Sequence, residues 1–252
     1  MALQHIIVPL YIYPEERAWA PLAAAARRHA NINFLVIINP NNGPGEGPLP
    51  DGSYTASLHQ LQSIPNIQLL GYVHCTYGRR PLEDVCRDVD RYYSWNAQLL
   101  RVDGIFIDEV PSAAEAVPYM AHLAGHVRSV WTCHSTVASG VLVFNPGVVV
   151  DTTLVELADY VVAFEQAHEQ WRVLRGEHEA LPREICRKAL AIVHTTTSED
   201  GSLEEVLQDA KGAGFAGVYI TDQHGGGFTR WPAQWDKFVQ LLSYDQTARE
   251  ET

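Results

Sequence analysis

The chain alternates short, continuous apolar runs with longer stretches in which apolar residues recur at helical spacing. The short runs are rich in β-branched residues and are bounded by Gly, Pro or Asn, which is typical of strands buried on both faces of a sheet. Eight strands are predicted, over residues 5–11, 33–39, 67–73, 103–108, 140–145, 159–165, 189–194 and 217–222. Predicted helices cover 15–30, 54–63, 81–100, 112–130, 153–157, 166–179, 202–213 and 232–243.

Strands that alternate with helices over 252 residues predict an α/β protein with a single (β/α)8 TIM barrel. We expect the barrel to cover residues 1–245 and a disordered tail to cover 246–252. An open, doubly wound sheet is the alternative, but it usually has fewer strands and a Gly-rich phosphate turn. Neither GxGxxG nor GxxxxGK[ST] follows the first strand. The glycines of "NNGPGEGP" are interspersed with prolines, which remove backbone N–H groups that a phosphate would need.

Charge and composition exclude several classes of partner. The formal net charge of -12 argues against nucleic acid and against an anionic membrane surface, since both require clustered Lys and Arg. No apolar run approaches the roughly 20 residues of a membrane span. The start "MALQHIIVPL" lacks a basic region and a cleavage site, so no signal peptide is visible and the sequence favours a cytoplasmic protein. The four cysteines form no CxxC pair and are expected to be free thiols.

Chemistry in a (β/α)8 barrel lies at the carboxyl ends of the strands, and polar residues gather at those positions in this chain. The stretch "DGIFIDEVP" ends the fourth strand on Asp108 and Glu109, and the sixth strand ends on Glu165. Because side chains alternate along a strand, Asp108 is expected to point into the barrel mouth in phase with Phe106. The residues expected to bind a substrate are Tyr11, Asn39, Tyr72, His74, Tyr77, Asn145, His194 and Asp222.

Three neighbouring carboxylates suggest acid–base chemistry. They cannot all ionise cheaply, and one protonated acid beside one ionised carboxylate is what glycosidic bond cleavage requires. We expect Asp108 to act at the anomeric carbon, Glu165 beside Phe164 to be the general acid, and Glu109 to tune the pair or bind the substrate's amide. The reverse order of Asp108 and Glu165 stays open. The structural alternative is that these carboxylates cap helices or form ion pairs.

The remaining mouth residues favour a sugar over a phosphorylated substrate. Tyr and Asn side chains are frequent there, whereas Arg79 and Arg80 are the only basic pair in these loops. A metal-dependent hydrolase is a third possibility, because His and carboxylate ligands are available at the strand ends. However, no HxH motif follows the first strand, which reads "IIVPLYIYP", so no metal and no cofactor are expected. The candidate ligands for a metal would be His74, Asp108, Glu165, His194, Asp222 and His224.

Several motifs occur in the order found in one known family. They are "IINPNNGPG", "GYVHCTYG", "RYYSWN", "VDGIFIDEVP", "FNPG", "LADYVVAFE" and "AIVH". Together they resemble the spherulin-4-like proteins and glycoside hydrolase family 135, which is kin to family 114. The resemblance runs from about residue 6 to 240.

The resemblance implies a metal-free (β/α)8 barrel that hydrolyses α-1,4 linkages in N-acetylgalactosamine-containing exopolysaccharides. The family's acidic pair after the fourth strand matches Asp108 and Glu109, and its later glutamate matches Glu165. The family usually has Thr where this chain has Cys75, and its members are often secreted. A polysaccharide or oligosaccharide is therefore the expected partner. The alternative is a non-catalytic carbohydrate-binding or developmental spherulin-like barrel.

Overall fold

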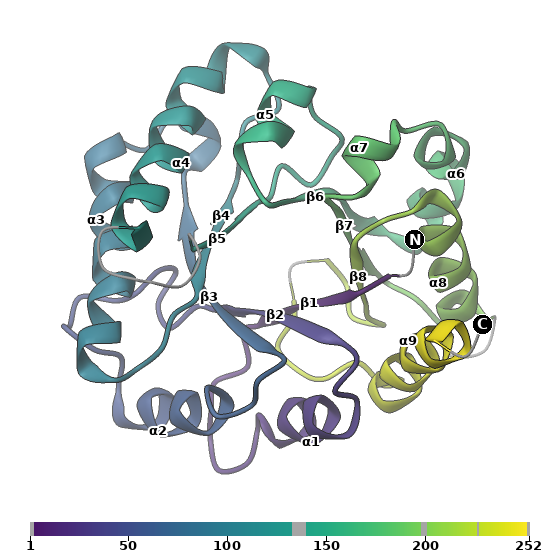
Figure 1. Ribbon diagram of the computed structural model, residues 1–252, viewed down its shortest axis with the longest axis horizontal. Coiled ribbons are helices and arrows are strands. Elements are labelled where there is room, and N and C mark those ends of the chain that lie inside the picture. The colour runs from purple at the N-terminus through teal and green to yellow at the C-terminus, as the bar shows by residue number, and fades with distance from the viewer. Residues whose placement is uncertain (1–2, 133–139, 198–200, 226, 251–252) are drawn as a thin grey trace.

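The computed structural model describes residues 3–132, 140–197, 201–225 and 227–250. Its eight strands form a closed parallel barrel in chain order, and the helices surround this central ring (Figure 1). The predicted (β/α)8 barrel is thus confirmed, and the doubly wound alternative is wrong. The strands are β1 (His5–Leu10), β2 (Asn33–Ile38), β3 (Ile67–His74), β4 (Gly104–Asp108), β5 (Val141–Phe144), β6 (Tyr160–Ala167), β7 (Ala189–His194) and β8 (Gly217–Ile220).

The helices follow the strands on the outside of the barrel. The α-helices are α1 (Ala20–Arg28), α2 (Gly52–Leu61), α3 (Leu82–Ser94), α4 (Val117–Thr132), α5 (Thr152–Leu157), α6 (His168–Glu179), α7 (Arg183–Cys186), α8 (Ser202–Ala213) and α9 (Trp235–Glu250). Three short 3₁₀ helices are η1 (Thr76–Gly78), η2 (Trp95–Gln98) and η3 (Ala114–Ala116).

The strands are apolar throughout because the barrel interior and the helix layer bury both of their faces. Every residue of β1 is buried, and so are the apolar residues of β4. At Gly71 in β3 the missing side chain makes room for α3, because a Cβ there would lie 2.4 Å from the ring of Tyr92. The Tyr92 hydroxyl donates to the carbonyl oxygen of Ile38 at 2.9 Å, so this ring ties α3 to β2 and β3.

Two features of register place the site. In the β3–β4 pair, Tyr72 lies beside Phe106 and His74 beside Asp108. In the β6–β7 pair the register shifts between Val162 and Phe164, which leaves one extra residue in β6. Such a bulge reverses the inside–outside alternation for the residues beyond it. The bulge therefore determines which side of the sheet Glu165 faces.

Helix boundaries differ from the predicted ones where local chemistry outweighs periodicity. Helix α1 begins at Ala20 rather than at residue 15, because Pro21 suits a first helical turn and Glu16 has a left-handed φ of 46°. The four-residue helix α7 was not predicted, since so short an element has no periodicity to detect. Helix α9 continues to Glu250, within the predicted disordered tail, because residues 246–250 include no Gly or Pro; residues 251–252 lie outside the described residues.

Cys75, Cys86 and Cys186 are free thiols, and Cys133 lies outside the described residues. In the part of the chain that the structure describes, no helix has the length and hydropathy needed to cross a bilayer.

Candidate active site

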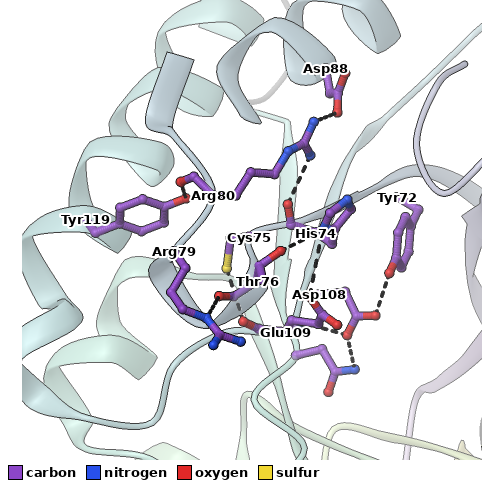
Figure 2. A network of polar contacts seen from close by, with 11 residues as sticks. Tyr72, His74, Cys75, Thr76, Arg79, Arg80, Asp88, Asp108, Glu109 and Tyr119 are labelled. Atoms are coloured by element: carbon purple, nitrogen blue, oxygen red, sulfur yellow. Dashed lines mark hydrogen bonds and ion pairs between the residues drawn. The ribbon is translucent and has the colours of Figure 1, made fainter. Parts of the chain in front are cut away.

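Asp108 sits at the carboxyl end of β4 and is held from both neighbouring strands. The Tyr72 hydroxyl on β3 donates to its Oδ2 at 2.8 Å, as Figure 2 shows. Its Oδ1 accepts from the backbone N–H of Glu109 and from the side chain of Asn145, each at 2.8 Å. The Tyr72 ring in turn stacks on Phe106 with centroids 6.2 Å apart. Asp108 therefore lies on the same side of the sheet as Phe106, with all three donors directed at its carboxylate.

Glu165 joins this group through Asn145. The Asn145 Nδ2 that donates to Asp108 also donates to Glu165 Oε2 at 2.6 Å. Asn145 directly follows β5 and is only 7 % exposed, and Glu165 lies near the end of β6. Because two carboxylate oxygens bond the same nitrogen, they lie no farther apart than the sum of the two distances. Three consecutive strands, β4, β5 and β6, thus bring two acidic residues to one point at the barrel mouth.

Burial and hydrogen bonding affect the pKa values of these two carboxyl groups differently. Burial, together with the negative charge of Asp108, raises the pKa of Glu165 to about 7, and the hydrogen bond from Asn145 offsets this only in part. Burial also raises the pKa of Asp108, but hydrogen bonds from Tyr72, Glu109 and Asn145 all oppose that rise. The site therefore favours a proton on Glu165 and a negative charge on Asp108.

Glu109 is held by its backbone rather than by its side chain. Its φ of 55° is left-handed, a region that non-glycine residues occupy at a cost. Its carbonyl oxygen accepts from the Tyr77 N–H at 2.7 Å and from the Cys75 thiol at 3.3 Å. Its carboxylate lies 3.7 Å from His74 Nδ1, which is also 3.0 Å from the Thr76 hydroxyl. The turn after β3 thus fixes the position of Glu109 (Figure 2).

Aromatic side chains line the same end of the barrel. The Tyr11 ring, just after β1, meets Tyr72 and Phe228 edge to face, each at 5.9 Å between centroids. Burial, and then the charge of Asp108, raises the pKa of Tyr11 well above its usual value. Tyr77 is 57 % exposed and has a left-handed φ of 54°. Tyr11 is thus a half-buried wall of the site, while Tyr77 presents its ring to solvent at the rim.

The other predicted site residues have partners elsewhere. Asn39 accepts the Gly43 N–H at 2.9 Å and so holds the loop after β2. His194 Nδ1 lies 2.8 Å from the Thr195 hydroxyl. Asp222 accepts from Arg230 at 2.6 Å and from the Ala233 N–H at 2.9 Å. These contacts hold loops at the strand ends and do not join the three residues to Asp108 or Glu165.

Both arginines of the predicted basic pair are engaged by the protein itself. Arg80 pairs with Asp88 at 2.6 Å and donates to the His74 carbonyl oxygen at 3.1 Å, while Arg79 donates to the Thr76 carbonyl oxygen at 3.2 Å (Figure 2). Arg80 therefore holds the turn after β3, which favours a structural role for this residue over phosphate binding.

The described residues include no group of three or more His, Cys, Asp or Glu side chains arranged to hold a metal ion. Of the candidate ligands, Asp108 and Glu165 are bridged by an amide, and Asp222 is paired with Arg230.

Two supporting residues were not foreseen. Phe228, in the loop after β8, is buried against Tyr11 and Tyr219. Asp88, on α3, pairs with Arg80, which in turn donates to the His74 carbonyl oxygen at the end of β3. Nothing in the sequence distinguishes an aromatic residue in a loop, or an acidic residue on a helix, as a residue that supports the site.

Comparison with known proteins assigns the chain. The model of the spherulation-specific family 4 matches residues 5–242. The chain belongs to this family. Spherulin-4 of Physarum polycephalum is 31 % identical over 229 residues, which are 88 % of this chain and 64 % of that protein. The chain thus spans less than two thirds of the length of this spherulin-4.

Solved structures agree with this spherulin-4 assignment. Sph3 of Aspergillus clavatus, crystallised in complex with GalNAc, has a TM-score of 0.88 and 31 % identity, with 96 % of this chain and 98 % of that chain covered. A chitinase of Rhizomucor miehei has a TM-score of 0.51 but only 10 % identity over 96 % of this chain and 99 % of that chain, and so shows the fold alone. The predicted resemblance to spherulin-4-like proteins is confirmed.

Proposed function

We propose that the protein is a glycoside hydrolase that cleaves α-1,4 linkages within N-acetylgalactosamine-containing polysaccharides, with Asp108, Glu109 and Glu165 as its catalytic residues. The observation that carries the proposal is the pair of carboxyl groups, Asp108 and Glu165, joined by one amide nitrogen at the mouth of the barrel. The likeness to Sph3, solved with GalNAc, supports the choice of sugar.

The two members of the pair suit different roles. Glu165, whose pKa is raised to about 7, holds a proton near neutral pH and donates it to the glycosidic oxygen as the C–O bond breaks. Asp108 is charged and held by three donors, so it attacks or stabilises the anomeric carbon as positive charge develops there. A water molecule then completes hydrolysis, with the ionised Glu165 accepting its proton.

Spacing favours retention of the anomeric configuration. The two oxygens that share the Asn145 nitrogen lie no farther apart than the sum of 2.8 and 2.6 Å, which is short of the roughly 6.5–9.5 Å at which an inverting pair admits a water molecule and compatible with the roughly 5–5.5 Å of retaining enzymes. Assistance by the sugar's 2-acetamido group would make this spacing rule inapplicable.

The rest of the mouth supplies contacts to a sugar. Glu109 and His74 offer an acceptor and a donor beside the pair, and the exposed ring of Tyr77 can stack on a sugar face at the rim. Contacts to a longer chain are expected from the loops that carry Asn39, His194 and Asp222. Such contacts on both sides of the cleaved bond would direct hydrolysis to internal linkages of a polymer.

The test is to incubate the protein with galactosaminogalactan and to separate the products by size. Release of oligosaccharides by the wild type, and none by Asp108→Asn at equal folded concentration, is the expected result. Binding of the polymer without any cleavage would instead support the carbohydrate-binding alternative. A requirement for added Zn²⁺ or Mn²⁺ would favour the metal-dependent alternative.

A further inference from the structure

We infer that Asn145 is a positioning residue: it donates one side-chain N–H to Asp108 and the other to Glu165, and so fixes their spacing and stabilises the charged form of each. This inference rests on the proposed function and gives a site residue a role other than sugar binding.

The two carboxylates use both side-chain N–H groups of Asn145. An asparagine NH₂ group has two protons, and Asn145 has one carboxylate acceptor for each, at 2.8 Å and 2.6 Å. The reverse orientation of the amide would set its carbonyl oxygen against the charged Asp108, which is repulsive. Asn145 therefore has no N–H left to offer a substrate hydroxyl.

Asp108 and Glu165 accept different numbers of hydrogen bonds. Asp108 receives hydrogen bonds from Tyr72, from the Glu109 N–H and from Asn145, whereas Asn145 is the one donor to the Glu165 carboxyl group among the described residues. Donors to a carboxylate favour its charged form. The amide also stands between the two carboxyl groups, so they do not share a proton directly as a carboxylate dyad in contact does.

The backbone of Asn145 is fixed as firmly as its side chain. Its N–H donates to the Ile107 carbonyl oxygen at 2.8 Å, and its carbonyl oxygen accepts from Val110 at 3.0 Å. In contrast, the side-chain Oδ1 is buried and has no partner among the described residues. A buried acceptor without a partner costs stability. A residue that served only packing would not carry that cost, which favours a role toward the carboxylates.

The other titratable groups around the pair lie at the ends of four strands. Tyr11 lies after β1, Tyr72 and Cys75 lie at the end of β3, and Glu109 follows β4. His194 ends β7, the neighbour of β6, and lies beside Ala167 in register. None of these groups bridges Asp108 and Glu165 as Asn145 does.

The experiment measures the titration of Glu165 by ¹³C NMR of its carboxyl carbon, which is assigned by its loss in Glu165→Gln. Asn145→Ala removes both donors, and Asn145→Asp keeps the shape while adding a negative charge. We expect the Glu165 midpoint to rise by about one pH unit in Asn145→Ala and further in Asn145→Asp. The basic limb of the pH–rate profile for hydrolysis should move by the same amount.

Asn66→Ala is the matched control, because the Asn66 amide bonds the carbonyl oxygens of Ala26, His29 and Ile32 just before β3, at the opposite end of the barrel. It should lower stability and leave the Glu165 midpoint unchanged. An unchanged midpoint in both Asn145 variants would overturn the inference, as would a higher KM with an unmoved pH profile. If the wild type cleaves no polymer, the proposed function fails, while the NMR titration still decides the role of Asn145.

Discussion

The Tyr72 hydroxyl donates a hydrogen bond to Asp108 Oδ2 at 2.8 Å across the β3–β4 pair. Burial and the negative charge of Asp108 raise the pKa of Tyr72, so this hydroxyl remains a donor at every pH at which the protein works. The bond both aims the carboxylate and stabilises its charge.

Tyr72→Phe should therefore weaken catalysis more than folding. Without this donor the pKa of Asp108 rises, so the acidic limb of the pH–rate profile moves to higher pH. A hydrogen bond to a charged group contributes about 1.5–3 kcal/mol, so we expect kcat/KM to fall about 10- to 100-fold. Tyr92→Phe is the control, since the Tyr92 hydroxyl donates to a backbone carbonyl oxygen instead. A Tyr72→Phe profile that superimposes on the wild type would show that Asp108 does not depend on this donor.

The sequence is sufficient to predict the barrel because its strands are short, continuous apolar runs. Short, continuous runs of β-branched and aromatic residues such as Ile105–Ile107, bounded by Gly or Pro, are typical of a strand buried on both faces. The positions of Asp108 and Glu165 at strand ends can be predicted from the same pattern. Periodicity therefore indicates the end of the barrel at which a residue lies.

The contacts within the site could not be predicted, because they depend on register. The bulge in β6 has no signature in "YVVAFEQA", yet it sets the direction of Glu165. Asn145 can donate to both Asp108 and Glu165 only because β4, β5 and β6 place the three residues side by side. Asp222 shows the same limit: its strand-end position predicts a sugar contact, but that position does not reveal the ion pair with Arg230, eight residues later.

Glu165 should make a contribution to stability that falls as the pH rises from about 5 to 8, in the direction opposite to that of buried His5, whose pKa is lowered to about 4. The folded-state pKa of Glu165, about 7, exceeds its ordinary value of 4.5, so the folded protein binds more protons at this group than the unfolded chain between these values. The stabilising contribution is complete below the unfolded pKa and is lost as pH passes through the folded pKa.

Glu165→Gln should remove this contribution, so the change in the free energy of unfolding between pH 5 and pH 8 should differ from that of the wild type by an amount on the order of 1–3 kcal/mol. Urea unfolding of both proteins at pH 5 and pH 8 measures it. Glu169→Gln, an exposed change on α6, is the control and should keep the wild-type slope. An equal slope in Glu165→Gln and the wild type would mean that the Glu165 carboxyl titrates near its ordinary value.

Leu99 offers a stabilising change away from the site. It follows η2 with a left-handed φ of 62° and is 81 % exposed, so its side chain has little packing to lose. Leu99→Gly relieves a strain of about 1–2 kcal/mol at a smaller cost in chain entropy, and should raise stability by about 0.5–1 kcal/mol. Leu99→Ala keeps the strain and should not stabilise. Thermal unfolding of the three proteins compares them, and a Gly variant no more stable than the Ala variant would contradict the argument.

The roles of the two central carboxyl groups can be separated by the leaving group. Glu165→Gln should reduce cleavage of the polymer about 10²- to 10⁴-fold, since the departing sugar oxygen then lacks a proton donor. An oligosaccharide with a nitrophenyl group needs little protonation to depart, so its cleavage should fall far less. Asp108→Asn should abolish both reactions, because charge at the anomeric carbon is needed with either leaving group.

The ratio of the two rates identifies the acid, whereas either rate alone also reports binding and folding. Equal loss on both substrates in Glu165→Gln, combined with a spared nitrophenyl substrate in Asp108→Asn, would exchange the two roles. That exchange is physically testable because the two groups differ in their surroundings: Asp108 has three donors, and Glu165 has a raised pKa. Full polymer activity in Glu165→Gln would contradict the site itself, since no proton donor at this position would then be required.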